Sequence, residues 1–171
     1  MPDGVFGVEV VTPEEALVAG GATAVVLRTT VGDMTVLDGH TALVADVAPC
    51  VVKVEQADGG TQLLAVHGGF LQVDTSPGAA EGLAEGNGPL PGLSTRVTVL
   101  AGVAELAQDI DVPRAEAAKE AAAQRVGELS SGRSSAADAD APASEADLAL
   151  AQAQGALARA ELRLEVASAG A

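Results

Sequence analysis

The amino-acid pattern changes abruptly near residue 109, and this change does most to restrict what the chain can fold into. Before it, short runs rich in Val, Leu and Thr follow one another closely, with Gly, Asp and Pro at turn positions between them. The strand-like runs are Gly7–Val11, Ala24–Arg28, Met34–Leu37, Val51–Glu55, Gln62–Val66, Phe70–Val73 and Arg96–Leu100. Many short strands without helical periods between them favour a β-sandwich or barrel.

Beyond residue 109 the chain is dominated by Ala, Glu, Gln, Arg and Lys, which are good helix formers. Asp111 is a suitable N-cap for a helix over residues 111–129, and Pro113 falls in its first turn. A second helix is predicted over residues 144–168. The positions expected to pack the helices together are Leu150, Leu157, Leu164, Ala153, Ala160 and Ala167, facing Ala115, Ala118, Ala122 and Leu129. We therefore expect an antiparallel helical hairpin.

The sequence thus predicts an all-β N-terminal domain over residues 1–109 and a C-terminal two-helix hairpin over residues 110–171. Within the first domain, the Gly- and Pro-rich stretch 75–95 interrupts two strand-like runs and offers little to bury. We expect this stretch to be a flexible insertion in a β-hairpin. The connection 130–143 between the helices contains the sequence SSGRSS and is also expected to be flexible.

The charge of the chain excludes several classes of partner. Its 24 acidic and 9 basic residues give a formal net charge of -15, so nucleic-acid phosphates would be repelled. Trp and Tyr are absent, which leaves no aromatic platform for stacking bases. An anionic lipid surface would repel the chain too, and no apolar run is long enough to span a bilayer. We expect no nucleic-acid partner and no direct lipid insertion.

The sequence predicts neither a metal site nor a catalytic centre. His40, His67 and Cys50 are scattered, without companions at ligand spacing. Cys50 stands among apolar residues, as expected for a small core residue. The Gly pair after His67 lacks the Lys and Ser/Thr of a phosphate-binding loop, so we expect a close backbone approach there instead.

The order of three segments resembles the epsilon subunit of the bacterial F-type rotary ATP synthase. The first is TTVGDMTVLDGH over residues 29–40, followed by TALVADVAP; the second is HGGFLQV over residues 67–73; the third is VLAGVAE over residues 99–105. A β-unit of this length, then IDVPRA over residues 110–115, then two Ala-rich helices, extends the resemblance along nearly the whole chain.

The resemblance implies a flattened β-sandwich followed by a helical hairpin in a non-catalytic subunit of the central stalk. It implies attachment to the gamma subunit and to the c-ring subunits, and contact of the hairpin with the alpha and beta subunits of the catalytic head. The expected location is peripheral, on the cytoplasmic face of the cell membrane, held by the synthase. No cofactor is required. The alternative is a free-standing β-sandwich interaction module with a coiled-coil tail.

Two residues are candidates for a partner interface because the resemblance places them there. His40 follows an Asp-Gly turn and matches the Gly-His position of the family, although a solvated turn histidine is the simpler interpretation. Asp33 matches the acidic position that meets the polar loops of the c ring, where a carboxylate can accept hydrogen bonds. It can equally be an ordinary acid at the end of a strand.

The segment IDVPRA also resembles the motif with which some bacterial epsilon subunits bind ATP. Arg125 lies eleven residues after Arg114, three helical turns, so the two guanidinium groups would project from nearly one face and hold phosphate oxygens. Asp111 would then accept from the adenine amino group. The alternative is that Asp111 caps the helix while both arginines are solvated. Regulatory ATP is therefore a possible ligand, with Asp111, Arg114 and Arg125 as its candidate residues.

Overall fold

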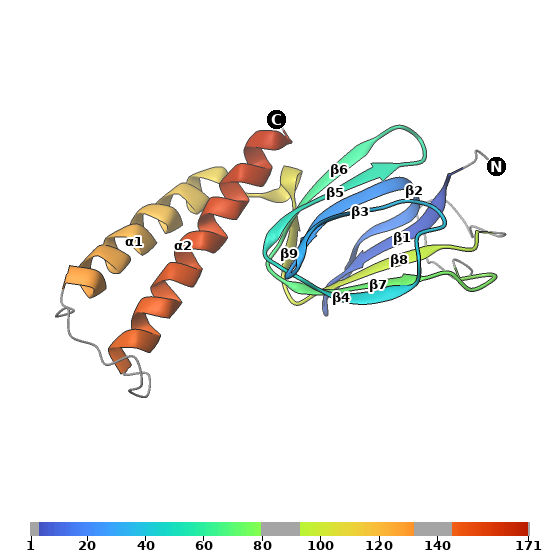
Figure 1. Cartoon of the computed structure of the whole chain (residues 1–171). Helices are drawn as coiled ribbons and strands as arrows, with labels where there is room; N and C mark the ends of the chain where they lie inside the picture. The colour runs from blue at the N-terminus through green and yellow to red at the C-terminus, as the bar shows by residue number, and fades with distance from the viewer. Residues whose placement is uncertain (1–3, 80–92, 132–144, 171) are drawn as a thin grey trace.

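A computed structural model describes residues 4–79, 93–131 and 145–170. It consists of a β-sandwich and, beside one end of it, a pair of long helices (Figure 1). This confirms the predicted fold class. The nine strands are β1 (Phe6–Val11), β2 (Ala16–Thr29), β3 (Gly32–Val36), β4 (Leu43–Val47), β5 (Cys50–Gln56), β6 (Thr61–Val66), β7 (Gly69–Asp74), β8 (Arg96–Ala101) and β9 (Ala104–Leu106).

Two of these strands, β4 and β9, lie outside the runs that looked strand-like in the sequence, and β2 is far longer than its predicted core. The strands pair in the order β1-β8-β7-β4-β2-β5-β6-β9, with β3 also on β2. The first part of β2 pairs with β1, from Ala16 to Ala22, and its last part pairs with β3 and β5. The pairing of β2 with both β1 and β4 closes the sandwich along this path.

The core of the sandwich is aliphatic. Its largest fully buried side chains are Phe6, Leu64, Leu71, Val8, Val10, Val25, Val36, Val52, Val54, Val66, Val97 and Val99. Most come from strands in which buried and less buried positions alternate, as in β8, because successive side chains point to opposite faces of a sheet. The one buried cysteine, Cys50, belongs to this cluster, and burial raises the pKa of its thiol.

Two helices follow a short 3-10 turn, η1 (Ala107–Asp109): α1 (Val112–Ser131) and α2 (Glu145–Ala169). The backbone N–H of Arg114 donates to Oδ1 of Asp111 at 3.0 Å, which is the predicted N-cap bond. Of the predicted packing positions, Ala115, Ala122, Leu150, Ala153 and Ala160 are buried. Ala118 is exposed, and the remaining predicted positions are partly buried.

The two segments predicted to be flexible lie largely outside the described residues. Residues 80–92 of the predicted insertion 75–95 and residues 132–144, which include most of the connection 130–143, lie outside the described residues. At the C-terminal end of the insertion, Leu93 and Thr95 are buried. The backbone N–H of Gly39 donates to the Thr95 hydroxyl at 3.1 Å, and that of Gly7 donates to the Thr95 carbonyl at 3.0 Å.

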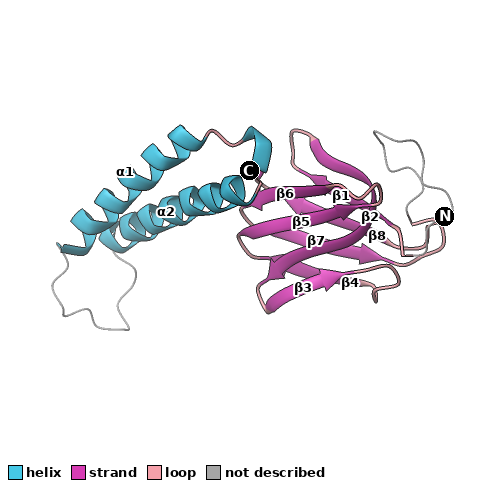
Figure 2. Cartoon of the chain, turned by 90° about the horizontal axis from the view of Figure 1, so that it is seen from above, coloured by secondary structure: helices cyan, strands magenta, loops and turns pink. Residues whose placement is uncertain are grey.

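The C-terminal half of α2 carries the contact with the sandwich (Figure 2). Leu162 and Val166 of α2 pack on Ala65 of β6, in a small apolar cluster separate from the sandwich core. Neither residue belongs to the seam of leucines predicted for α2, because they face the sandwich and not α1. No helix of the described residues combines the length and hydropathy that a membrane span needs.

Candidate functional site

The junction between the sandwich and the hairpin gathers two of the charged groups that the sequence singled out, together with three that it did not. A hollow of about 340 Å³ opens there between β9, η1 and the two helices. It is lined by Glu105, Asp109, Asp111, Arg114, Ala115, Ala118 and Arg163. Asp111 and Arg114 are thus brought together, with Arg163 of α2 as an unpredicted third member.

An ion pair closes one wall of this hollow. The guanidinium of Arg163 donates from Nε and a terminal nitrogen to the two oxygens of Glu105, at 2.6 and 2.7 Å. Both side chains are about two-thirds buried or more, at 27% and 33% exposure. The hydrogen bonds from Arg163 hold the pKa of Glu105 below its usual 4.5, and the carboxylate in turn raises the pKa of Arg163. This bidentate pair joins α2 to β9.

The third predicted ATP residue lies elsewhere. Arg125 is exposed on α1 and donates to Glu128 at 3.3 Å, one turn further along the same helix. Eleven residues of helix separate it from Arg114 by about 16 Å of rise. The hollow holds three carboxylates and two guanidinium groups, and one guanidinium is already paired. The described residues therefore offer a nucleotide one unpaired arginine, Arg114, amid an excess of negative charge. ATP binding stays a prediction.

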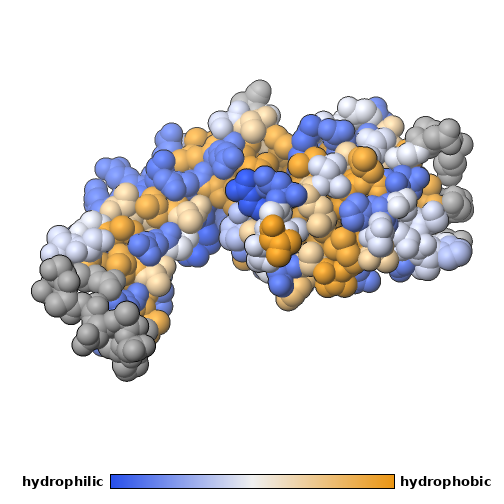
Figure 3. All heavy atoms as spheres, viewed as in Figure 1, coloured by the Kyte–Doolittle hydropathy of each residue, from blue (hydrophilic) through white to orange (hydrophobic). Residues whose placement is uncertain are grey.

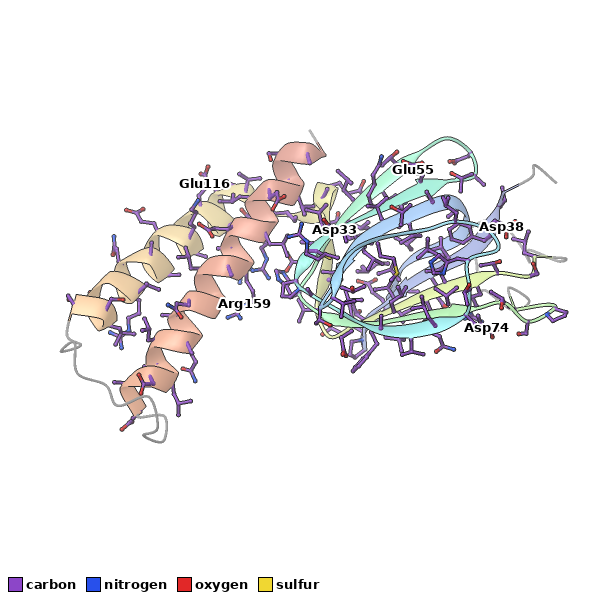
Figure 4. The ribbon with its side chains drawn as sticks, in the orientation of Figure 1. Asp33, Asp38, Glu55, Asp74, Glu116 and Arg159 are labelled. Carbon is purple, nitrogen blue, oxygen red and sulfur yellow. The ribbon has the colours of Figure 1, made fainter. Side chains whose placement is uncertain are left out.

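The two predicted interface residues lie at different ends of the sandwich. Figure 4 places Asp33 at the end beside the hairpin and Asp38, two residues before His40, at the opposite end. Asp33 forms an exposed ion pair with Arg28 at 2.6 Å, and this hydrogen bond holds the pKa of Asp33 below 3.8. The Nδ1 atom of His40 lies 2.9 Å from the carbonyl oxygen of Thr41. A single flat partner surface would not cover both residues.

An apolar area that no sequence pattern predicted lies on the outer face of β4, β7 and β8. Phe70 on β7 is 54% exposed and pairs across the sheet with Leu100 on β8, which is 45% exposed. Val44 on β4 lies opposite Gln72, two pairs further along on the same face, and is 72% exposed. Apolar atoms reach the surface of the sandwich around β4 in Figure 3. We call Val44, Phe70 and Leu100 the outer apolar face. These residues are far apart in the sequence, so only the register of the strands shows that they share one face.

Within the described residues, no group of three or more His, Cys, Asp or Glu side chains is arranged to hold a metal ion. A second hollow of about 200 Å³ lies under α2, where Leu162 and Glu165 face Arg28, Asp33 and Cys50. It contains the Arg28–Asp33 pair already described and no further ion pair between described residues. The junction and the outer apolar face are therefore the two surfaces with a distinctive chemistry.

Comparison with known proteins covers both parts of the chain. Residues 5–77 match the family described as ATP synthase, Delta/Epsilon chain, beta-sandwich domain. The ATP synthase epsilon chain of Bordetella petrii is 40% identical over 115 residues, which are 67% of this chain and 68% of that one. The epsilon chain of Thermobifida fusca is 40% identical over 117 residues, 67% of this chain and 72% of that one.

A solved structure shares the fold over a longer stretch. A chain in the cryo-EM structure of the Euglena gracilis mitochondrial ATP synthase, which contains OSCP, F1 and the c-ring, superposes with a TM-score of 0.64. The match covers 95% of this chain and 81% of that chain at 21% sequence identity. The likeness includes the hairpin as well as the sandwich.

Proposed function

The chain belongs to the family of ATP synthase epsilon chains, non-catalytic subunits of the synthase stalk, and we propose that it links the gamma subunit to the c ring. In this role the sandwich is clamped between a shaft and a rotating ring, so that rotation driven by proton flow reaches the catalytic head. The chain is then held peripherally at the cytoplasmic face of the membrane by its partners. Its hairpin regulates ATP hydrolysis through contact with the head.

The observation that carries the proposal is the outer apolar face. The chain has two phenylalanines: Phe6 is fully buried in the core, whereas Phe70 is more than half exposed on a sheet. Phe70, Val44 and Leu100 form a cluster of large apolar side chains on the surface. Such clusters mark sites of protein interaction. Gamma is the partner that we assign to this face.

The surroundings of the face suit a protein partner better than a lipid surface. Asp46 lies directly opposite Phe70 on the neighbouring strand, and Gln72 lies opposite Val44. An apolar centre with a polar rim is the usual anatomy of a specific protein interface. We expect apolar contacts to dominate, so that the complex with gamma withstands moderate salt.

The proposal is tested with purified gamma, by size exclusion and calorimetry. We expect a one-to-one complex with the full-length chain. Phe70→Asp should weaken binding by at least about tenfold, the scale of a central aromatic contact. Leu148→Asp is the matched control, because Leu148 is 56% exposed in the first turn of α2, at the end of that helix away from the sandwich (Figure 1). This control should change the Kd by less than about twofold.

Two outcomes would contradict the proposal. Absence of any complex with the unmodified chain would remove gamma as the partner. Equal loss of binding in Phe70→Asp and Leu148→Asp would show a general effect of added charge and would remove the outer apolar face as the contact.

Regulatory ATP is a second candidate, favoured by the single observation that Asp111, Arg114 and Arg163 line one hollow. Phosphate oxygens would be held by Arg114, and Asp111 would accept from the adenine amino group. We expect weak binding, because Glu105 and Asp109 line the same hollow and repel phosphates. Calorimetry with ATP tests this: Arg114→Gln should abolish the binding, whereas Arg125→Gln should leave it unchanged.

A further inference from the structure

His67 is a half-buried ionisable group at the hairpin junction that the proposed function does not use. Neither of its ring nitrogens is exposed or has a hydrogen-bond partner among the described residues. It follows β6 two residues after Ala65, which is fully buried against α2. Since side chains two apart lie on the same side of a strand, His67 belongs to the helix-facing side of the junction.

The same side carries the Glu105–Arg163 ion pair. Glu105 lies directly opposite Ala65 in the antiparallel pairing of β6 with β9, so the two side chains share a face. The charged groups that act on His67 are therefore Glu105 from β9 and Arg163 and Arg159 from α2. Arg114 of α1 acts in turn on Glu105. The charges of Glu105, Arg163 and Arg159 thus act on His67 where the hairpin docks, and of these Glu105 and Arg163 are in direct contact.

We propose that His67 and the Glu105–Arg163 pair form a proton-operated latch, in which protonation of His67 weakens the docking of the hairpin on the sandwich. The inference rests on the proposed function, in which the hairpin regulates hydrolysis. It deepens that function because it names protonation as the signal that releases the hairpin. The chemistry requires nothing beyond a proton. A positive imidazolium placed beside Arg163 and Arg159 competes with Arg163 for Glu105 and repels α2.

The electrostatics give the direction of the effect. Burial lowers the pKa of His67 below its usual 6.5, and Arg163 lowers it further, with a smaller opposing effect of Glu105. Undocking exposes the ring and removes the arginines, so the undocked state binds the proton more tightly. Docking is then strongest above pH 6.5 and weakens as the pH falls below that value. Each unit of difference in the His67 pKa between the two states corresponds to about a tenfold change in the docking equilibrium.

The test uses the isolated full-length chain, so it does not depend on gamma or on the synthase. The chain holds two histidines, and an NMR titration of their imidazoles distinguishes them, with His40 as the internal reference. Spin labels on Thr35→Cys of β3 and Gln154→Cys of α2, both exposed positions, report the distance between sandwich and hairpin. The labels are placed in a Cys50→Ala background, because Cys50 lines the hollow under α2 and undocking would uncover it.

As the pH is lowered from about 8 to about 5, we expect a population with a longer label distance to grow. Its midpoint should coincide with the titration of His67, below pH 6.5. His67→Gln should abolish the growth, whereas the matched variant His40→Gln should retain it. Persistence of the growth in His67→Gln, or a label distance independent of pH in the unmodified chain, would overturn the proposal.

If His67→Gln does not fold, the proposal is tested on the unmodified chain alone. There, a His67 titration midpoint that differs from the midpoint of the distance change would overturn the latch. Loss of the latch would leave the gamma contact untouched, and loss of gamma binding would leave the latch untouched, because the two rest on different surfaces.

Discussion

At the scale of single residues, Gly69 shows why the backbone of this sandwich admits little change. Its φ is +151°, a conformation that favours glycine, and a Cβ at this position would overlap the carbonyl oxygen of Leu100 on β8. The Gly pair after His67 was interpreted from the sequence as a close backbone approach, and the contact between β7 and β8 is such an approach.

Gly69→Ala should lower the free energy of unfolding by about 3 kcal/mol or more, because a strained φ and a backbone overlap act together. Gly127→Ala is the control: Gly127 lies in α1 with open space around it, so alanine there should raise stability by about 0.5–1 kcal/mol. Urea unfolding followed by circular dichroism measures both, since the chain lacks Trp and Tyr for fluorescence. Equal stabilities of the two variants would contradict the prediction.

Arg163 and Arg125 offer a matched pair of ion-pair deletions. Arg163→Gln should lower the free energy of unfolding by about 1.5–3 kcal/mol, because its bidentate bonds to Glu105 are mostly shielded from water. Arg125→Gln should cost at most about 0.5 kcal/mol, because its pair with Glu128 is exposed. Comparable losses of stability in the two variants would show that burial of the Glu105–Arg163 pair adds nothing to its contribution to stability.

The Glu105 pair also has a pH dependence with a fixed sign. The folded-state pKa of Glu105 lies below 4.5, so the folded state holds the carboxylate ionised where the unfolded state begins to bind a proton. The stabilisation is complete above pH 4.5 and is lost as the pH falls through the lower folded-state pKa. The stability difference between the unmodified chain and Arg163→Gln should therefore shrink in acid, as urea titrations at several pH values will measure.

At the scale of secondary-structure elements, the two helices were predictable and their second buried face was not. The expected ranges, 111–129 and 144–168, lie within two residues of the ends of α1 and α2. The leucines seven apart describe one face of α2, the face toward α1. Leu162 and Val166 lie off that period and bury against β6, a contact that only the tertiary arrangement creates.

The missed strand β4 has a similar explanation. Its sequence, LVADV, contains Ala and Asp, which are weak strand formers. Its pairing with β7 along five residues determines its conformation instead. The predicted partner of Arg114 was Arg125 because helical spacing is visible in a sequence. The Glu105–Arg163 pair joins residues 58 apart, and no local pattern reveals it.

Close packing of the helices leads to a further prediction. Ala160 of α2 is 1% exposed, whereas Ala158 is exposed on the same helix. Ala160→Leu should lower the free energy of unfolding of the hairpin by about 1–3 kcal/mol, because a larger side chain forces the helix backbones apart. Ala158→Leu should stay within about 0.5 kcal/mol of the unmodified chain. Thermal unfolding measured by the helical circular dichroism signal separates the two.

At the scale of the whole molecule, the hairpin offers few free cations to an acidic partner. Arg163 is paired with Glu105, Arg125 with Glu128, and Lys119 with Glu161 at 3.5 Å. A chain ending before Val112 should therefore raise ATP hydrolysis by the assembled synthase less than about fivefold, since exposed ion pairs contribute at most about 1 kcal/mol each. Proton pumping should survive through the sandwich.

Membrane vesicles that carry the full-length or the shortened chain allow both activities to be measured side by side. A much larger rise in hydrolysis would show that the hairpin is a strong inhibitor despite its paired charges. Collapse of pumping would show that coupling runs through the hairpin.

The path of β2 has a mechanical consequence. Its fourteen residues pair with β1 in one part and with β3 and β5 in the other, while Thr29 reaches β4. One continuous strand thereby forms hydrogen bonds with parts of the sandwich that would otherwise be joined by side-chain packing alone. Torsion applied at the outer apolar face reaches the far strands through covalent bonds and hydrogen-bonded ladders, which resist shear far better than sliding side chains do. In the role proposed above, a sandwich that turns with a shaft benefits from such stiffness, because elastic lag in the sandwich would delay every step of the rotor.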